Sequence, residues 1–207
     1  MNVVVIDLGV SNIPSLTSAL TYVGAPHVVT RDPNLLESAT HVVLPGVGAF
    51  DAAMRMIGSL SLTNHLRRYA IEQKRPLLGV CLGMQLLCEG SEEGSLPGLA
   101  LVPGRVTRLS GSAAPRHKVP HVGFSAVYGY TDDGLFKGLG QQTYFYFTHS
   151  FALPSLKEAA NIGLCDHASR FVGAFQKGNI CGAQFHPEKS QSAGLRLISN
   201  FLEFASS

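Results

Sequence analysis

The chain has 207 residues, of which 45% are hydrophobic and only 14% are charged, and its formal net charge is +2. This composition is typical of a compact globular protein and argues against intrinsic disorder. Because the net charge is small and no block of like charges occurs, we expect neither nucleic acid nor an anionic membrane to be the main partner.

The compartment is indicated by the cysteines and by the start of the chain. The four cysteines show no CxxC spacing, and the opening sequence MNVVVIDLG carries an aspartate and lacks the basic segment of a signal peptide. No apolar stretch approaches the length of a membrane-spanning helix. We therefore expect a cytoplasmic protein with reduced thiols. Metal-ligand spacings and a phosphate-binding loop are also missing, so we expect no metal and no cofactor.

Strands and helices are predicted to alternate over the first ninety residues. Buried β-rich runs predict strands at 3–6, 27–30, 40–44 and 77–80. Helices are predicted from a cap at Asn12 to about residue 22, over 51–73 with a break at 58–59, and over 82–89. This alternation predicts a parallel, doubly wound sheet.

The second half of the sequence lacks long helices until its end. Residues 102–109, 119–128 and 144–151 are predicted as strands, and 171–176 and 180–185 as a hairpin around Lys177–Gly178–Asn179. An amphipathic helix is expected at about 192–204. The predicted fold class is α/β: one domain over 1–207 with a doubly wound, mostly parallel sheet flanked by helices and antiparallel strands added in the C-terminal half.

The sequence Gly79–Val80–Cys81–Leu82–Gly83 lies between a predicted strand and a predicted helix. It has the form G-x-C-x-G, the thiol version of a nucleophile elbow, in which a strained turn lifts the side chain off the sheet. A Cβ atom at either glycine is expected to crowd neighbouring backbone, and the positive end of the following helix favours a thiolate and an oxyanion. The alternative is a buried structural cysteine on a glycine-rich turn.

A base for this thiol is predicted at His186, which ends a short apolar strand and precedes Pro187 and Glu188. Pro187 holds His186 in extended backbone, where residues two apart project to the same side. Glu188 is therefore expected to orient one imidazole nitrogen while the other faces Cys81, as nucleophilic catalysis requires. A histidine before proline is otherwise often a simple turn residue.

GVCLGMQ at 79–85 together with QFHPEKS at 184–190 resembles the class I glutamine amidotransferases. The resemblance implies hydrolysis of L-glutamine to glutamate and ammonia by a Cys81, His186 and Glu188 triad. It also implies that PGVGAF at 45–50 supplies one oxyanion amide, from Val47 or Gly48, and that Leu82 supplies the other. Gln85, one turn beyond Cys81, would contact the bound glutamine; the alternative is a solvated helix residue.

Further segments resemble the glutaminase subunits of imidazole glycerol phosphate synthases, namely KVPHVG at 118–123, YFTHS at 146–150 and the Lys-Ser pair after HPE. The resemblance places His149 and Ser150 at the glutamine site, although His149 could be a core histidine and Ser150 could simply end a strand. It also implies a heterodimer with a (β/α)₈-barrel cyclase that uses the ammonia in histidine biosynthesis. Two departures, Phe124–Ser125 in place of Trp-Asn and the loop IDLGVSNIPS, concern positions that tend to face the partner.

Several functions remain open at this point. Because the elbow, the histidine strand and the closing helix use the whole chain, we expect the acceptor of ammonia to be a separate protein. Alternatives are a glutaminase subunit of another pathway, such as anthranilate or pyridoxal phosphate synthesis, and a non-catalytic amidotransferase-like regulator. A cysteine peptidase is a third, for which Gln85 and the short loops are unfavourable.

Overall fold

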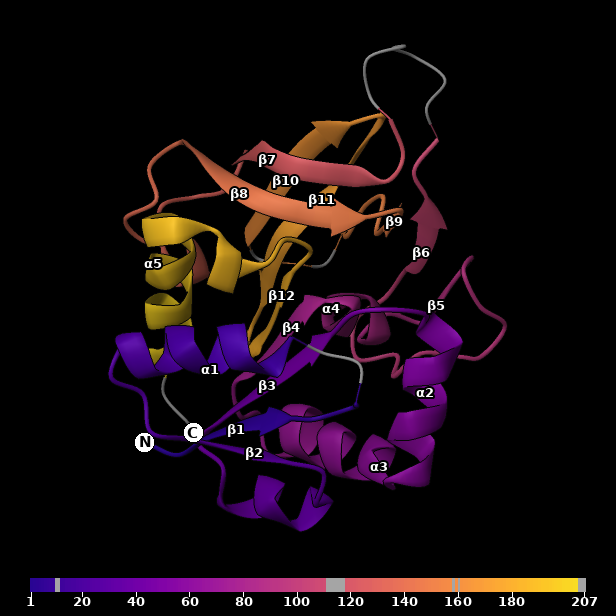
Figure 1. Ribbon diagram of the computed structural model, residues 1–207, viewed down its shortest axis with the longest axis vertical. Coiled ribbons are helices and arrows are strands. Elements are labelled where there is room, and N and C mark those ends of the chain that lie inside the picture. The colour runs from indigo at the N-terminus through magenta and orange to yellow at the C-terminus, as the bar shows by residue number, and fades with distance from the viewer. Residues whose placement is uncertain (10–11, 111–117, 158, 160, 205–207) are drawn as a thin grey trace.

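The computed structural model describes residues 1–9, 12–110, 118–157, 159 and 161–204. Nine strands form one sheet in the order β2-β1-β3-β4-β12-β11-β10-β7-β8 (Figure 1). Its first five strands are parallel and the remainder pair antiparallel. In this order they are β2 (His27–Thr30), β1 (Val3–Ile6), β3 (His41–Gly46), β4 (Leu77–Cys81), β12 (Ile180–Ala183), β11 (Ser169–Lys177), β10 (Asn161–His167), β7 (His121–Tyr128) and β8 (Gln142–His149). A small second sheet joins β5 (Gly90–Ser91), β6 (Arg105–Arg108) and β9 (Phe151–Ala152).

Helices cover both faces of the large sheet (Figure 1). Side chains alternate across β1: Val3 and Val5 belong to one buried cluster, and Val4 and Ile6 to another. The first cluster includes side chains of α1 (Ile13–Tyr22) and α5 (Gln191–Leu202). The second includes those of α2 (Phe50–Ser59), α3 (Leu62–Arg67), the π-helical turn Arg68–Glu72 and α4 (Leu82–Leu86). The predicted α/β class is thereby confirmed.

Most predicted elements are found close to their expected bounds. The strands at 3–6 and 27–30 and the helix ending at residue 22 are confirmed. The helix predicted over 51–73 is broken, but at 60–61 and not at the predicted 58–59, which still belong to α2. Asn12 does precede α1, but its side chain makes no capping hydrogen bond. The third strand runs on through Pro45 and Gly46, because β1 no longer pairs there and the missing N–H of Pro45 costs no bond on that side.

The second half departs further from the prediction. The expected strand at 144–151 is divided into β8 and β9, and these belong to different sheets. The predicted strand at 102–109 is shortened to β6, while the predicted hairpin is confirmed as β11 and β12. No strand was predicted at β10, which pairs with β11 along its length and contains Gly163. A Cβ atom at Gly163 would lie 2.5 Å from Val127 Cγ1, so packing requires the glycine that obscures the strand pattern.

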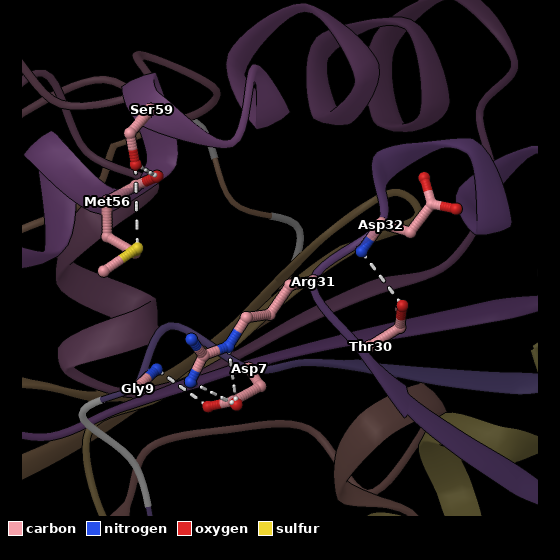
Figure 2. Close-up of polar contacts among 7 residues, drawn as sticks. All are labelled: Asp7, Gly9, Thr30, Arg31, Asp32, Met56 and Ser59. Carbon is pink, nitrogen blue, oxygen red and sulfur yellow. Dashed lines mark hydrogen bonds and ion pairs between the residues drawn. The ribbon is translucent and has the colours of Figure 1, made fainter.

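Polar contacts fix the segment that follows β1 at the carboxyl ends of the parallel strands. The Asp7 carboxylate accepts a hydrogen bond from the Gly9 backbone N–H at 2.7 Å, and its Oδ2 lies 2.8 Å from Arg31 Nη2 (Figure 2). Arg31 directly follows β2, so this ion pair joins the ends of two neighbouring strands. Val10 and Ser11 of the unusual IDLGVSNIPS loop lie outside the described residues.

Candidate active site

Cys81 is the last residue of β4 and has the left-handed backbone angles φ 53° and ψ −113°. Such a conformation is unfavourable for a residue with a side chain and is typical of a nucleophile elbow. Ideal Cβ atoms would lie 2.7 Å from the Met84 backbone at Gly79 and 1.7 Å from the Leu44 carbonyl oxygen at Gly83. The expected need for glycine on both sides of the cysteine is therefore confirmed.

The helix after the elbow is shorter than predicted. It was expected to reach residue 89, but α4 ends at Leu86. The reason is that N–H groups from the segment 98–102 take the carbonyl groups that would continue the helix, for example Leu99 N–H to Leu86 O and Ala100 N–H to Cys88 O. Five helical residues make a smaller dipole than the predicted helix, so local N–H groups matter more than the helix as a whole.

The backbone of His186 is fixed on both sides. Its N–H donates to the Tyr146 carbonyl at 2.9 Å, and its carbonyl accepts from Ser190 Oγ at 2.6 Å. The ring Nδ1 lies 2.8 Å from Glu188 Oε1, and both side chains are buried. Glu188 reaches the ring from the short 3₁₀ helix Pro187–Lys189 and not, as predicted, from extended backbone. The contact between His186 and Glu188 was predicted correctly, whereas the predicted backbone conformation of Glu188 was wrong.

Cys81 and Glu188 together determine the charge of His186. Burial lowers the pKa of His186, but the interaction with the Cys81 sulfur, the hydrogen bond to Glu188 and the negative charges of both groups outweigh burial and raise the pKa to about 9. His186 Nε2 is buried and has no hydrogen-bond partner of ordinary geometry among the described residues. The ring is therefore suited to hold a proton beside the Cys81 sulfur and to pass it on.

A cavity of about 350 Å³ opens beside the Cys81 sulfur. It brings together the elbow, the turn after β3 and the end of β8, which are far apart in the sequence. All six residues predicted for the oxyanion and the substrate are among those that line it. The lining residues are Val47, Gly48, Cys81, Leu82, Gln85, Glu93, Pro120, Thr148, His149, Ser150 and Phe151.

Glu93, which was not predicted as a site residue, carries the only carboxylate among the described residues that line the cavity. Its Oε2 accepts a hydrogen bond from the Phe50 backbone N–H at 3.0 Å, at the start of α2. Glu93 lies in a loop without periodic pattern, and the loop is held by Asp51, which accepts from the N–H groups of Ser95 and Leu96. No local signal in the sequence could have indicated this position.

Gln85 is buried, so its interpretation as a solvated helix residue is wrong. Its Nε2 donates to the Phe151 carbonyl at 2.8 Å and to Gln184 Oε1 at 3.1 Å. Both amide protons are thus used within the protein. The Gln85 carbonyl oxygen is left as the atom available to a ligand in the cavity.

His149 lines the cavity and is also held by the core. Its Nδ1 lies 2.8 Å from the Phe151 carbonyl and its Nε2 3.1 Å from His121 Nδ1. Because a carbonyl oxygen only accepts, His149 carries its proton on Nδ1. Burial lowers the pKa of His149 to about 4, against the opposing effect of the Phe151 hydrogen bond. The ring is therefore neutral near pH 7.

The other three cysteines are buried and free, and burial suppresses their reactivity. It raises the pKa of Cys88 and of Cys165 to about 12, and it raises that of Cys181 as well. In the described part of the chain no group of three His, Cys, Asp or Glu side chains is placed to hold a metal ion. Within the same ranges, none of the helices has the length and apolar character needed to cross a membrane.

Known proteins similar to this chain include enzymes of one family. The family model described as glutamine amidotransferase class-I matches residues 4–204. A protein from Xylella fastidiosa named imidazole glycerol phosphate synthase subunit HisH is 43% identical over 97% of this chain and 96% of its own length. A protein of the same subunit name from Moorella thermoacetica is 42% identical over 97% of this chain and 94% of its own length. One named HisH 2, from Methanococcus maripaludis, is 36% identical over 98% of this chain and 100% of its own length.

Solved structures support the fold. A crystal structure of a glutamine amidotransferase superposes with a TM-score of 0.73 at 18% identity, covering 97% of both chains. Another, from Thermotoga maritima, gives a TM-score of 0.63 at 18% identity and covers 98% of this chain and 83% of its own. At these identities the likeness concerns the fold alone.

Proposed function

Because the chain belongs to the class I glutamine amidotransferases, we propose that it is the glutaminase subunit of an imidazole glycerol phosphate synthase. It hydrolyses L-glutamine to glutamate and ammonia, and the ammonia serves histidine biosynthesis. The observation that carries the chemistry is the interaction of the buried His186–Glu188 pair with Cys81, which stands on its strained elbow and lines the cavity. The names of relatives that match nearly the whole chain support the pathway.

The raised pKa of His186 determines the order of proton transfers. This raised pKa lets the ring take the proton of the Cys81 thiol as the sulfur attacks the side-chain carboxamide carbon of glutamine. The tetrahedral oxyanion collapses to a thioester as the leaving nitrogen takes the proton from His186 Nε2 and departs as ammonia. His186, now neutral, takes a proton from a water molecule whose oxygen attacks the thioester. The second tetrahedral intermediate releases glutamate, and the Cys81 sulfur takes its proton back from His186.

The oxyanion is stabilised by backbone N–H groups of Leu82 and of Val47 or Gly48, which all line the cavity. Gly48 has a φ of 95°, which only glycine adopts readily. The peptide units around Val47 can therefore rotate at little steric cost. The turn is active when its N–H group points at the oxyanion and inactive when it points away. Changing the population from almost wholly inactive to almost wholly active requires a difference of about 5.5 kcal/mol in the binding energy of a ligand for the two states, which a protein partner can supply.

The amino-acid part of the substrate is held by the polar side of the cavity. Glu93 binds the α-ammonium group, since it carries the one carboxylate among the described lining residues. The Gln85 carbonyl oxygen accepts from substrate N–H groups, because both protons of its amide are already used. His149 and Ser150 also line the cavity, and the neutral His149 ring adds no charge that would repel the ammonium group.

The partner implied by the resemblance is a (β/α)₈-barrel cyclase that receives the ammonia as a heterodimer subunit. The test measures ammonia release from glutamine by the chain alone, with a candidate cyclase, and with cyclase plus its nucleotide ligand. A steep rise only in the last mixture is expected. Full activity of the isolated chain that no partner changes would contradict the obligate complex. Activation by an anthranilate or pyridoxal phosphate synthase partner instead would assign the glutaminase to that pathway.

A further inference from the structure

A chain of hydrogen bonds with one consistent direction links the Phe151 carbonyl to Cys81. That carbonyl accepts from Gln85 Nε2 and lies within hydrogen-bond distance of His149 Nδ1, each at 2.8 Å. A carbonyl oxygen has no proton to give, so Gln85 must direct its NH₂ group at Phe151. The second proton of this NH₂ group is given to Gln184 Oε1 at 3.1 Å.

The direction of the Gln184 amide follows from that of Gln85. With its carbonyl oxygen committed to Gln85, Gln184 presents its NH₂ group to the Cys81 sulfur, and Nε2 lies 3.9 Å from Sγ. A flipped Gln184 amide would set two NH₂ groups against each other and would turn its oxygen toward the sulfur. Of these two orientations, the donor and acceptor pattern permits only the first.

Burial makes this arrangement rigid. Gln184 has no exposed surface, and its backbone N–H donates separately to the Gly173 carbonyl at 2.8 Å. The strand therefore does not need the side-chain amide for its own pairing. A buried donor aimed at a sulfur favours the charged form of that sulfur, since hydrogen bonds to an ionised acceptor are stronger than those to a neutral one.

We propose that Gln184 is a second donor to the nucleophile, which stabilises the Cys81 thiolate and transmits the fixed orientation of Gln85 to it. This role rests on the proposed function, in which Cys81 attacks glutamine. It adds a residue outside the triad: His186 approaches the sulfur with a titrating proton, whereas Gln184 provides a proton that does not titrate. The Gln184 side-chain amide also connects Cys81 to Gln85, and through the Phe151 carbonyl to His149, both of which line the cavity.

The test measures the rate at which iodoacetamide alkylates Cys81 between about pH 5 and 9.5, with the modified peptide identified by mass. This readout requires neither glutamine nor a partner. In Gln184→Met, which keeps the length but loses the donor, the midpoint of the rate profile should rise by about one pH unit. Gln184→Glu keeps the acceptor for Gln85 and should raise the midpoint further, because a carboxylate beside the sulfur opposes thiolate formation.

Asn200→Leu serves as the matched control. Asn200 is also a buried amide, and it donates to the Leu135 and Lys137 carbonyls without lining the active-site cavity. This variant should lose stability and keep the alkylation midpoint of the parent chain. An unchanged midpoint in folded Gln184→Met and Gln184→Glu, or an equal shift in Asn200→Leu, would overturn the proposal. If Gln184→Met does not fold, Gln184→Glu decides.

The failure of the proposed function would look different. A parent chain without ammonia release under any partner condition, but with a Gln184-dependent alkylation midpoint, would remove the glutaminase and leave the thiolate donor. A partner-activated glutaminase whose alkylation midpoint does not change when Gln184 is substituted would remove the thiolate donor and leave the glutaminase.

Discussion

The carbonyl oxygen of Leu44 lies against the Cα atom of Gly83, in the space that a side chain at residue 83 would need; an ideal Cβ there would be 1.7 Å from that oxygen. Leu44 belongs to β3 and Gly83 to α4, so this contact sets how closely the first turn after Cys81 packs on the neighbouring strand. The turn that carries Cys81 packs this closely on β3 only because residue 83 has no Cβ atom.

Gly83→Ala should lower the free energy of unfolding by about 3 kcal/mol or more, since backbone must move to admit the methyl group. Urea denaturation followed by circular dichroism measures the change. Gly58→Ala in α2 is the control, because a Cβ atom at Gly58 meets nothing within 4 Å. It should raise stability by about 0.5–1 kcal/mol through helix propensity. Equal effects of the two substitutions would contradict the packing argument.

A glutamine-like diazo-ketone should modify one thiol, that of Cys81. The reason is that burial raises the pKa of Cys88, Cys165 and Cys181, which leaves them as inert thiols at neutral pH. Peptide mapping of the modified chain identifies the site, and Cys81→Ser should take up no label. Modification of any of the other three cysteines while Cys81 stays free would refute the assignment of the nucleophile.

His186→Ala should lower turnover by about 10³-fold or more, because both proton transfers lose their carrier. Glu188→Gln should cost less, since an amide oxygen can still orient the ring. Ammonia release in the presence of an activating partner measures both. Near-parental turnover of His186→Ala would exclude the triad, whatever the result at Glu188.

The pKa of His186 should fall from about 9 when Cys81 is replaced by serine. Burial lowers this pKa, whereas Cys81 and Glu188 raise it, so the loss of the sulfur charge shifts the balance toward the neutral ring. The proton is held below the pKa and released above it, so Cys81→Ser should hold His186 neutral at a pH where the parent chain keeps it charged. NMR titration of the ring signals provides the measurement, and an unaltered titration would show that the sulfur does not interact with the ring.

Gln85→Ala should raise the Michaelis constant for glutamine about tenfold, in line with the loss of one hydrogen bond of about 1.4 kcal/mol. His149→Asn and His149→Ala form a useful pair, because asparagine can keep a donor to the Phe151 carbonyl and alanine cannot. His149→Asn should therefore have a lower Michaelis constant for glutamine than His149→Ala, close to that of the parent chain. Parental constants in Gln85→Ala and His149→Ala would remove both residues from the substrate site.

The sequence predicted those parts of the site that depend on short segments. The elbow around Cys81 is a local pattern of two glycines, and its strain and packing are as expected. The His186–Glu188 contact was also predictable, because only one residue separates the two. The 3₁₀ turn that forms the contact was not, since Pro187 is compatible with both extended and helical backbone.

The remaining parts depend on tertiary contacts. Glu93 reaches the cavity because Asp51 holds its loop, and the two residues are far apart in the sequence. Gln184 belongs to the QFHPEKS segment at 184–190, and its spacing from His186 is the alternation that brings strand residues to one side. The missing information was that its amide meets Gln85 and Cys81.

The position of β12 has a consequence for synthesis of the protein. It is the last strand of the chain, yet it lies in the interior of the sheet between β4 and β11. While a nascent chain lacks residues 180–183, β4 keeps an open edge beside the nucleophile, and His186 has not yet left the ribosome. A prematurely terminated chain therefore carries Cys81 without His186, and under the proposed mechanism such a fragment lacks the base needed to hydrolyse glutamine.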